Sequence, residues 1–269
     1  MGIRKFSKGF GSAVGKGQRK AAKFIRKKSK EVGKLGSEIK TSYKEGLTEQ
    51  RLSEFELLER AVNAHDEEHI LQLIEDGIFV DVKDENGNTL LMLSSYLADT
   101  WAVKVLLRSF GANPNARNDF GSRPLHFAAP TASPERIFST NERGTKEKVH
   151  IIKFLLKAGA DIDAQNEDGK TPLMNATSYG NISALIALLN AGADPNVVDN
   201  NGESALFSAV CINADDSVKL MEPLIAAGAR LDLRNRAGEG IEDRARDLVA
   251  EKKECQALVS YLKKKSVKK

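Results

Sequence analysis

A short motif recurs through the middle of the chain and constrains its fold more than any other feature. Gly-x-x-x-Leu begins at Gly87, Gly121, Gly169 and Gly202. A second marker, aliphatic residues followed within a few positions by Gly, ends at Gly77, Gly111, Gly159, Gly192 and Gly228. Both markers have a period near 33 residues where no insertion intervenes. Such a repeat is too short to bury its own apolar face, so the copies are expected to stack.

Residues 168–196 show the local structure of one copy. Asp168 and Gly169 form a turn pair suited to a hairpin tip with positive φ. Thr171 can cap a helix whose first residue is Pro172, where a missing N–H costs nothing. Gly180-Asn181 breaks this helix, and a second apolar helix runs to a C-cap at Ala191-Gly192. The unit is therefore predicted as a hairpin tip followed by two helices.

Two further segments complete the pattern, Leu125-His126-Phe127-Ala128 and Gly159-Ala160-Asp161. With them, residues 51–262 resemble the ankyrin repeat family. The resemblance implies an all-α ankyrin solenoid of about five to six repeats, including atypical caps, with helix pairs joined by hairpin loops. We expect a cap at 51–81, repeats at 82–115, 116–163, 164–196 and 197–232, and a cap at 233–262.

Charge divides the chain into three parts. Residues 1–50 carry 14 Lys or Arg and 4 Glu, a net charge of +10. Residues 51–262 carry 22 basic and 33 acidic side chains, a net charge of −11, and residues 263–269 add five lysines. An acidic body therefore lies between a basic arm and a basic tail.

The arm, residues 1–50, is rich in Gly and Lys and is expected to be partly helical or disordered. From about Arg19 it reads as a basic amphipathic helix, which suits an anionic membrane surface. The candidate anionic-surface residues are Arg19, Lys20, Lys23, Arg26, Lys27, Lys28 and Lys30. A solvated arm, a nucleic acid or an import receptor as its ligand, and folding onto the acidic body remain alternatives.

Several departures from the repeat pattern lead to specific expectations. Gly121 and Gly159 are 38 residues apart, against 23 for Gly169 and Gly192, so about 15 residues are inserted near 130–148. Two prolines and mixed charge predict an exposed loop there. Pro223 should kink the second helix of its repeat or shift its start. Trp101 is expected to pack at the start of a helix.

Candidate chemistry is sparse. His65 to His69 formally fits the zinc-protease pattern H-x-x-E-H, but the repeat register places His65 in a turn between helices. The family uses His126 to bind neighbouring loops, which implies a structural role here. Cys211 and Cys255 form no metal pattern. We expect no catalytic residue, metal, cofactor or small-molecule substrate, and no enzymatic activity.

The location expected for the chain follows from what its sequence lacks. No apolar run approaches the ~20 residues of a membrane span, and no apolar block follows the basic start. The two separate cysteines favour a reducing compartment. We expect a cytoplasmic protein, without a coiled coil, that associates peripherally with membranes. A nuclear protein and one delivered into a host cell are the alternatives.

The resemblance implies a protein-binding scaffold whose contact surface is concave, built from hairpin tips and the exposed side of each first helix. Carried over by register, the candidate partner-binding residues are Tyr96, Arg117, Asp119, Phe120, Phe127, Asn175, Tyr179, Asn200, Arg234 and Arg236. Exposed aromatic residues in such a groove are favoured binding residues. The partner is therefore expected to be a protein, with an anionic membrane as a second ligand. The alternatives are a nucleic-acid or chromatin-associated adaptor and a secreted effector of an intracellular bacterium that acts on a host protein.

Overall fold

The computed structural model describes residues 52–130, 142–210 and 214–251, and chain contacts separate residues 1–51 from a second compact unit that begins at Leu52. The fold described below is that of the second unit. The basic arm with its seven candidate anionic-surface residues, the tail at 263–269 and both cysteines lie outside the described residues.

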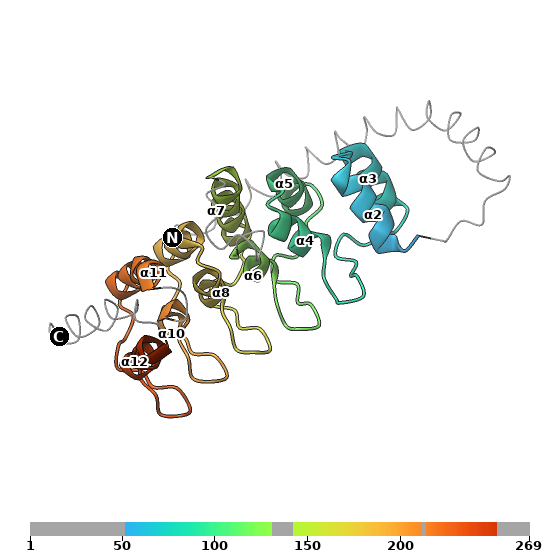
Figure 1. The fold of residues 1–269 in the computed structure, drawn as a ribbon. Helices are drawn as coiled ribbons and strands as arrows, with labels where there is room; N and C mark the ends of the chain where they lie inside the picture. The colour runs from blue at the N-terminus through green and yellow to red at the C-terminus, as the bar shows by residue number, and fades with distance from the viewer. Residues whose placement is uncertain (1–51, 131–141, 211–213, 252–269) are drawn as a thin grey trace, which may run out of the picture. The chain divides into compact units, whose positions relative to one another are not determined.

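Helices in the described residues pair in sequence and stack in two rows (Figure 1). The first helices of the pairs are α2 (Glu54–Asn63), α4 (Leu90–Leu97), α6 (Pro124–Ala128), α8 (Pro172–Ser178), α10 (Ala205–Val210) and α12 (Ile241–Glu251). The second helices are α3 (Glu67–Glu75), α5 (Thr100–Arg108), α7 (Glu142–Lys157), α9 (Ile182–Asn190) and α11 (Ala214–Ala226). Hairpin loops project from the row of first helices. The predicted all-α solenoid is confirmed.

The helix boundaries of the 168–196 copy follow the local signals in its sequence. The Thr171 hydroxyl accepts a hydrogen bond from the Met174 N–H at 3.3 Å, and Pro172 is the first helical residue. Gly180, at φ +64°, ends α8, and the Asn181 side chain caps α9. The predicted cap, first residue and break are confirmed.

Backbone hydrogen bonds link each hairpin tip to the next. The donor–acceptor pairs are Asp119 N to Asn86 O (3.2 Å), Glu167 N to Phe120 O (3.0 Å), Asn200 N to Asp168 O (2.9 Å) and Arg236 N to Asn201 O (2.8 Å). The tip glycines permit this approach. Gly169 has φ +78°, and a Cβ there would lie 2.7 Å from the Asn200 nitrogen. The tips thus form a ladder that resembles the edge of a sheet, although the described residues contain only isolated β-bridges.

One apolar cluster runs through the described helix pairs. It extends from Leu58 in α2 through Leu106 and Leu155 to Ala245 in α12, all fully buried. Burial between neighbouring pairs, rather than within one pair, accounts for the continuity of this core. Helix α11 continues through Pro223.

The expectation of an exposed loop through Lys148 is wrong for its C-terminal part. Helix α7 already begins at Glu142, and Lys148 is only 2% exposed. The insertion therefore lengthens the second helix at its N-terminal end. Lys148 can be buried there because three backbone carbonyls surround its amine. Residues 131–141 of the insertion lie outside the described residues.

Candidate partner-binding surface

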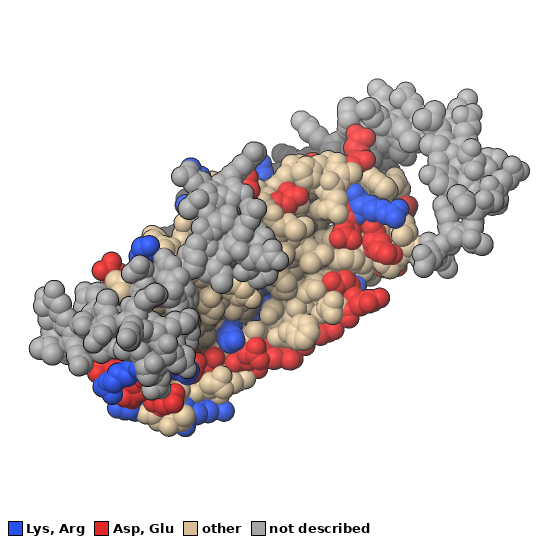
Figure 2. Space-filling model, viewed as in Figure 1, with Lys and Arg blue, Asp and Glu red and all other residues tan. Residues whose placement is uncertain are grey.

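The hairpin tips and the exposed side of the first helices form the surface to which the candidate residues were assigned. We call the row of tips the hairpin edge, residues 83–88, 117–122, 165–170, 198–203 and 234–239. Figure 2 shows acidic side chains along much of this edge. By sequence, Glu85, Asp119 and Glu167 lie in the earlier tips beside the basic Lys83, Arg117 and Lys170, and Arg234 and Arg236 lie in the last tip. The inter-tip hydrogen bonds fix the backbone that carries them.

The four aromatic candidates differ in exposure. Phe120, at a hairpin tip, is 61% exposed, and Tyr179, at the end of α8, is 40% exposed. Phe127 and Tyr96 are half-buried on α6 and α4. An exposed aromatic ring on a fixed backbone is a favourable anchor for a partner, because little conformational entropy is lost on binding. Phe120 and Tyr179 meet that description, whereas Phe127 and Tyr96 expose less of their surface.

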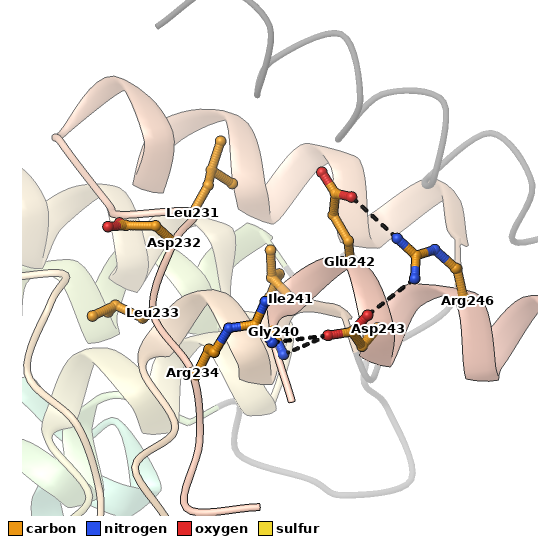
Figure 3. Close-up of a pocket in the computed structure, with 9 residues that line it drawn as sticks. All are labelled: Leu231, Asp232, Leu233, Arg234, Gly240, Ile241, Glu242, Asp243 and Arg246. Atoms are coloured by element: carbon orange, nitrogen blue, oxygen red, sulfur yellow. Dashed lines mark hydrogen bonds and ion pairs between the residues drawn. The ribbon is translucent and has the colours of Figure 1, made fainter. Parts of the chain in front are cut away.

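Three of the polar candidates already have partners within the chain. The Asn200 side-chain amide donates to the Glu167 carbonyl at 2.6 Å, and that of Asn175 donates to the His126 carbonyl at 3.4 Å. Arg234 donates to the Gly238 carbonyl at 2.7 Å and pairs with Asp243 at 3.3 Å (Figure 3). These side chains hold neighbouring elements together. Arg117, Asp119 and Arg236 are exposed at the tips.

His126 connects two successive hairpins from a buried position in α6. Its Nδ1 accepts a hydrogen bond from the Arg123 N–H at 3.2 Å, which leaves Nε2–H to donate to the Lys170 carbonyl at 2.9 Å. Burial lowers the pKa of this imidazole, so the neutral form that fits these bonds is favoured. The structural role expected for His126 is confirmed.

His65 lies in the turn between α2 and α3, as its register indicates. Its backbone has φ +55°, its Nε2 lies 2.9 Å from an Asp99 carboxylate oxygen, and its ring centroid is 4.3 Å from that of Trp101. Trp101 packs at the start of α5, as expected. His69 lies on α3 and is exposed. Within residues 52–130, 142–210 and 214–251, no group of three or more His, Cys, Asp or Glu side chains is arranged to hold a metal.

Lys148 is the site residue that reasoning from the sequence missed. Its ammonium donates to the carbonyls of Ser95 (2.9 Å), Tyr96 (2.6 Å) and Phe127 (3.0 Å), and it lies 5.3 Å from the Tyr96 ring centroid. Burial lowers the pKa of this amine to about 7. The amine thus links α7 to the backbone carbonyls of the two half-buried aromatic candidates, Tyr96 and Phe127. One signal marks Lys148 in advance: it lies eleven residues before Gly159, the interval that separates Asn181 from Gly192.

Comparison with protein-family models identifies the family to which this helical stack belongs. A family model described as ankyrin repeats (3 copies) matches residues 144–235, and one described as ankyrin repeat matches residues 86–119 and 120–167. The chain is an ankyrin repeat protein. Ankyrin repeats are general protein–protein interaction modules, and the fold is typically non-enzymatic. No helix in the described part of this ankyrin protein has the length and apolar character needed to cross a bilayer.

Relatives of this ankyrin protein include much larger proteins. Neurogenic locus notch homolog protein 1 of Danio rerio is 34% identical over 156 residues, which cover 58% of this chain. The protein of the same name from Homo sapiens is 30% identical over 182 residues, or 66% of this chain. The chain spans about 6% of the length of these relatives. The similarity is therefore confined to a small part of each relative.

A solved structure supports the same fold. The ankyrin repeat domain ABAYE2397 from Acinetobacter baumannii superposes with a TM-score of 0.60 at 24% identity and covers 78% of this chain and 98% of that one. At this identity the likeness establishes the fold alone.

Several apolar residues of this ankyrin protein are exposed that were not foreseen, and Phe79 and Leu97 are the most exposed of the described ones. Phe79 is 80% exposed in the segment between α3 and the first hairpin, and Leu97 is 64% exposed at the end of α4. The residue after Leu97, Ala98, adopts φ +63° and ends the helix. Nothing in the local pattern distinguishes Leu97 from the buried Leu90 and Leu91 in the same helix.

Proposed function

We propose that this ankyrin protein is a non-enzymatic scaffold that binds a protein partner on its concave face, with its basic arm associating with an anionic surface such as a membrane. The observation that carries the proposal is Phe120. Its ring is 61% exposed, while its backbone carbonyl accepts a hydrogen bond from the Glu167 N–H in the next tip. The ring is thus held out on a rigid edge, which suits a binding anchor.

Charge around Phe120 indicates the chemistry of the partner. Asp119 precedes it, and Glu85 and Glu167 occupy the neighbouring tips. A partner segment that places an apolar side chain against Phe120 and cations beside it would complement this part of the edge. Tyr179 supplies a second exposed aromatic ring on the same row of first helices.

Alanine substitution tests the concave face. Phe120→Ala and Tyr179→Ala should each reduce capture of the partner from the native cell without lowering the melting temperature. Phe79→Ala is the matched control, because Phe79 is more exposed than Phe120 but lies outside the hairpin edge. Equal capture by Phe120→Ala and Phe79→Ala would rule out the assigned face.

Vesicles test the arm. Full-length protein should sediment with vesicles that contain phosphatidylserine, and added salt should release it. Lys23→Glu with Lys27→Glu should abolish this binding, because each basic residue near the surface adds ~1 kcal/mol. Retention on DNA or RNA, but not on the vesicles, would favour the adaptor alternative instead.

A further inference from the structure

A groove on the second-helix row combines positive charge with an apolar floor. We call it the α5–α7 groove: it has a volume of about 240 Å³ and is lined by Lys104, Leu107, Arg108, Phe154, Lys157 and Ala158. Helices α5 and α7 lie in the row away from the hairpin loops (Figure 1). This surface is separate from the hairpin edge, so an inference about it does not depend on the proposed function.

The cations of the groove belong to like-charge pairs on their helices. Lys104 and Arg108 stand four residues apart on α5, and Lys153 and Lys157 stand four residues apart on α7. Like charges at this spacing face each other on a helix and destabilise it. Lys104, Arg108 and Lys157 line the groove, whereas Lys153 does not. No acidic residue is among the described residues that line it.

The positive charge also opposes that of the surrounding body. Residues 51–262 have a net charge of −11, yet helix α5 contains no acidic residue. A pocket at the C-terminal end of the stack, about 220 Å³ in volume, offers a direct comparison. There Arg234 pairs with Asp243, and Arg246 pairs with both Glu242 and Asp243 (Figure 3). The C-terminal pocket neutralises its own charge, whereas the α5–α7 groove has no acidic lining to do so.

The floor of the groove restricts what the cations can hold. Leu107 and Phe154 are half-buried, and the Arg108 guanidinium lies 5.3 Å from the centroid of the Phe154 ring. Apolar side chains at the bottom of a groove can contact a side chain of a ligand. Binding to a bilayer instead requires apolar side chains that protrude into the lipid. A nucleic-acid backbone presents phosphates without an apolar side chain to fill the floor. The basic arm and tail have the same sign of charge as the groove and do not complement it.

We propose that the α5–α7 groove binds an acidic peptide segment of a partner protein that carries an apolar side chain between its carboxylates. The apolar side chain contacts Leu107 and Phe154. The carboxylates pair with Lys104 and Lys157 on the two sides of the groove. The ligand thereby relieves the repulsion within each helix, because each like-charge pair gains an anion beside it.

Fluorescence anisotropy with full-length protein tests this assignment. The probe is a fluorescein-labelled peptide, GEDELFDEDG, and its comparison peptide is GEDESSDEDG, which has the same charge. Saturable binding of the first peptide, at least about tenfold tighter than that of the second, is expected because only the first fills the apolar floor. Equal affinities, or no saturable binding, would overturn the proposal.

Paired charge reversal locates the binding. Lys104→Glu with Lys157→Glu should weaken binding of the probe by at least about tenfold. Arg60→Glu with Arg230→Glu is the matched control, since it makes the same change in net charge at exposed sites outside the groove, and it should change the affinity less than about threefold. Equal weakening by the two pairs would show that the peptide responds only to net charge, in the arm or elsewhere. Thermal unfolding checks that each variant is folded. If charge reversal unfolds the chain, the neutral pair Lys104→Gln with Lys157→Gln replaces it, and this pair should weaken binding of the probe by more than the control's limit of about threefold and by less than about tenfold.

Discussion

Two successive repeats solve the same structural problem with different side chains. Asn181 lies eleven residues before Gly192, and Lys148 lies eleven residues before Gly159, so the two residues share one register position. Asn181 caps α9 by accepting a hydrogen bond from the Ala184 N–H at 3.1 Å, and its amide donates to the Ala129 carbonyl at 3.0 Å. Lys148 cannot cap α7, because that helix already begins at Glu142.

Both side chains nevertheless donate to carbonyls at the end of the preceding repeat's first helix. Asn181 reaches Ala129, which caps α6, and Lys148 reaches Ser95 and Tyr96 near the end of α4. The last carbonyls of a helix lack partners within it and need donors from elsewhere. The comparison indicates that a donor at this position satisfies helix-end carbonyls in both of these repeats. In the insertion-bearing repeat, where the second helix is longer, the longer side chain of Lys148 takes that role.

Removal of these donors should give the largest effect. Lys148→Met leaves one buried and two part-buried carbonyls without a donor, while the apolar side chain removes the cost of a buried charge. We expect a loss of about 3 kcal/mol in the free energy of unfolding, measured by urea denaturation. Asn181→Ala removes one cap and one buried bond and should cost about 2 kcal/mol.

Lys153→Ala is the control for Lys148→Met, because Lys153 is exposed on the same helix. It should change the free energy of unfolding by less than about 0.5 kcal/mol. If Lys148→Met proved as stable as the native chain, the three hydrogen bonds of Lys148 would contribute no more than the cost of burying its amine, and the stack would not depend on this donor.

Substitution of a hairpin-tip glycine should destabilise the two repeats equally, although their second helices differ. A Cβ at Gly121 would lie 2.9 Å from the Glu167 nitrogen, and one at Gly169 would lie 2.7 Å from the Asn200 nitrogen. Both glycines have positive φ. Gly121→Ala and Gly169→Ala should therefore each cost about 2 kcal/mol in thermal or urea unfolding.

Gly192→Ala separates the cost of backbone strain from the cost of a steric clash at the added Cβ. Gly192 has φ +95°, but a Cβ there would meet no atom within 4 Å. The substitution should cost about 1 kcal/mol, the price of the backbone conformation alone. A cost at Gly121 well below that at Gly169 would mean that the insertion also loosens the hairpin edge.

These differences also show what the sequence could predict. Gly169, Thr171 and Pro172 act locally, so their turn, cap and first helical position could be identified from residue type and spacing. Lys148 acts on carbonyls 21 to 53 residues away, and it lies in a stretch whose prolines and charges indicated a loop. The exposure of Phe120 relative to Phe127 depends on the neighbouring repeat, which local pattern does not specify.

The buried amine should make the stability of the insertion-bearing repeat depend on pH. The pKa of Lys148 is lowered by burial to about 7, whereas an unfolded lysine keeps its proton to about pH 10. Between these values the unfolded chain binds more protons, so the contribution of this group to stability rises with pH. The free energy of unfolding of the native chain, minus that of Lys148→Met, should increase by about 1 kcal/mol from pH 7 to pH 8. A difference that stays constant or falls would show that the three carbonyls keep the amine protonated above pH 8.

Ser217 extends the comparison to a third repeat and should give the smallest effect. It lies eleven residues before Gly228, and α11 begins at Ala214, so it too stands inside a helix rather than at its cap. Its hydroxyl is buried without a hydrogen-bond partner among the described residues. Unlike Lys148, this side chain makes no hydrogen bond to the preceding repeat among the described residues. Ser217→Ala should therefore stabilise the chain slightly, by about 0.5 kcal/mol in urea unfolding, because an unsatisfied polar group is removed. A loss of stability instead would mean that Ser217, like Asn181 and Lys148, donates across the repeat boundary.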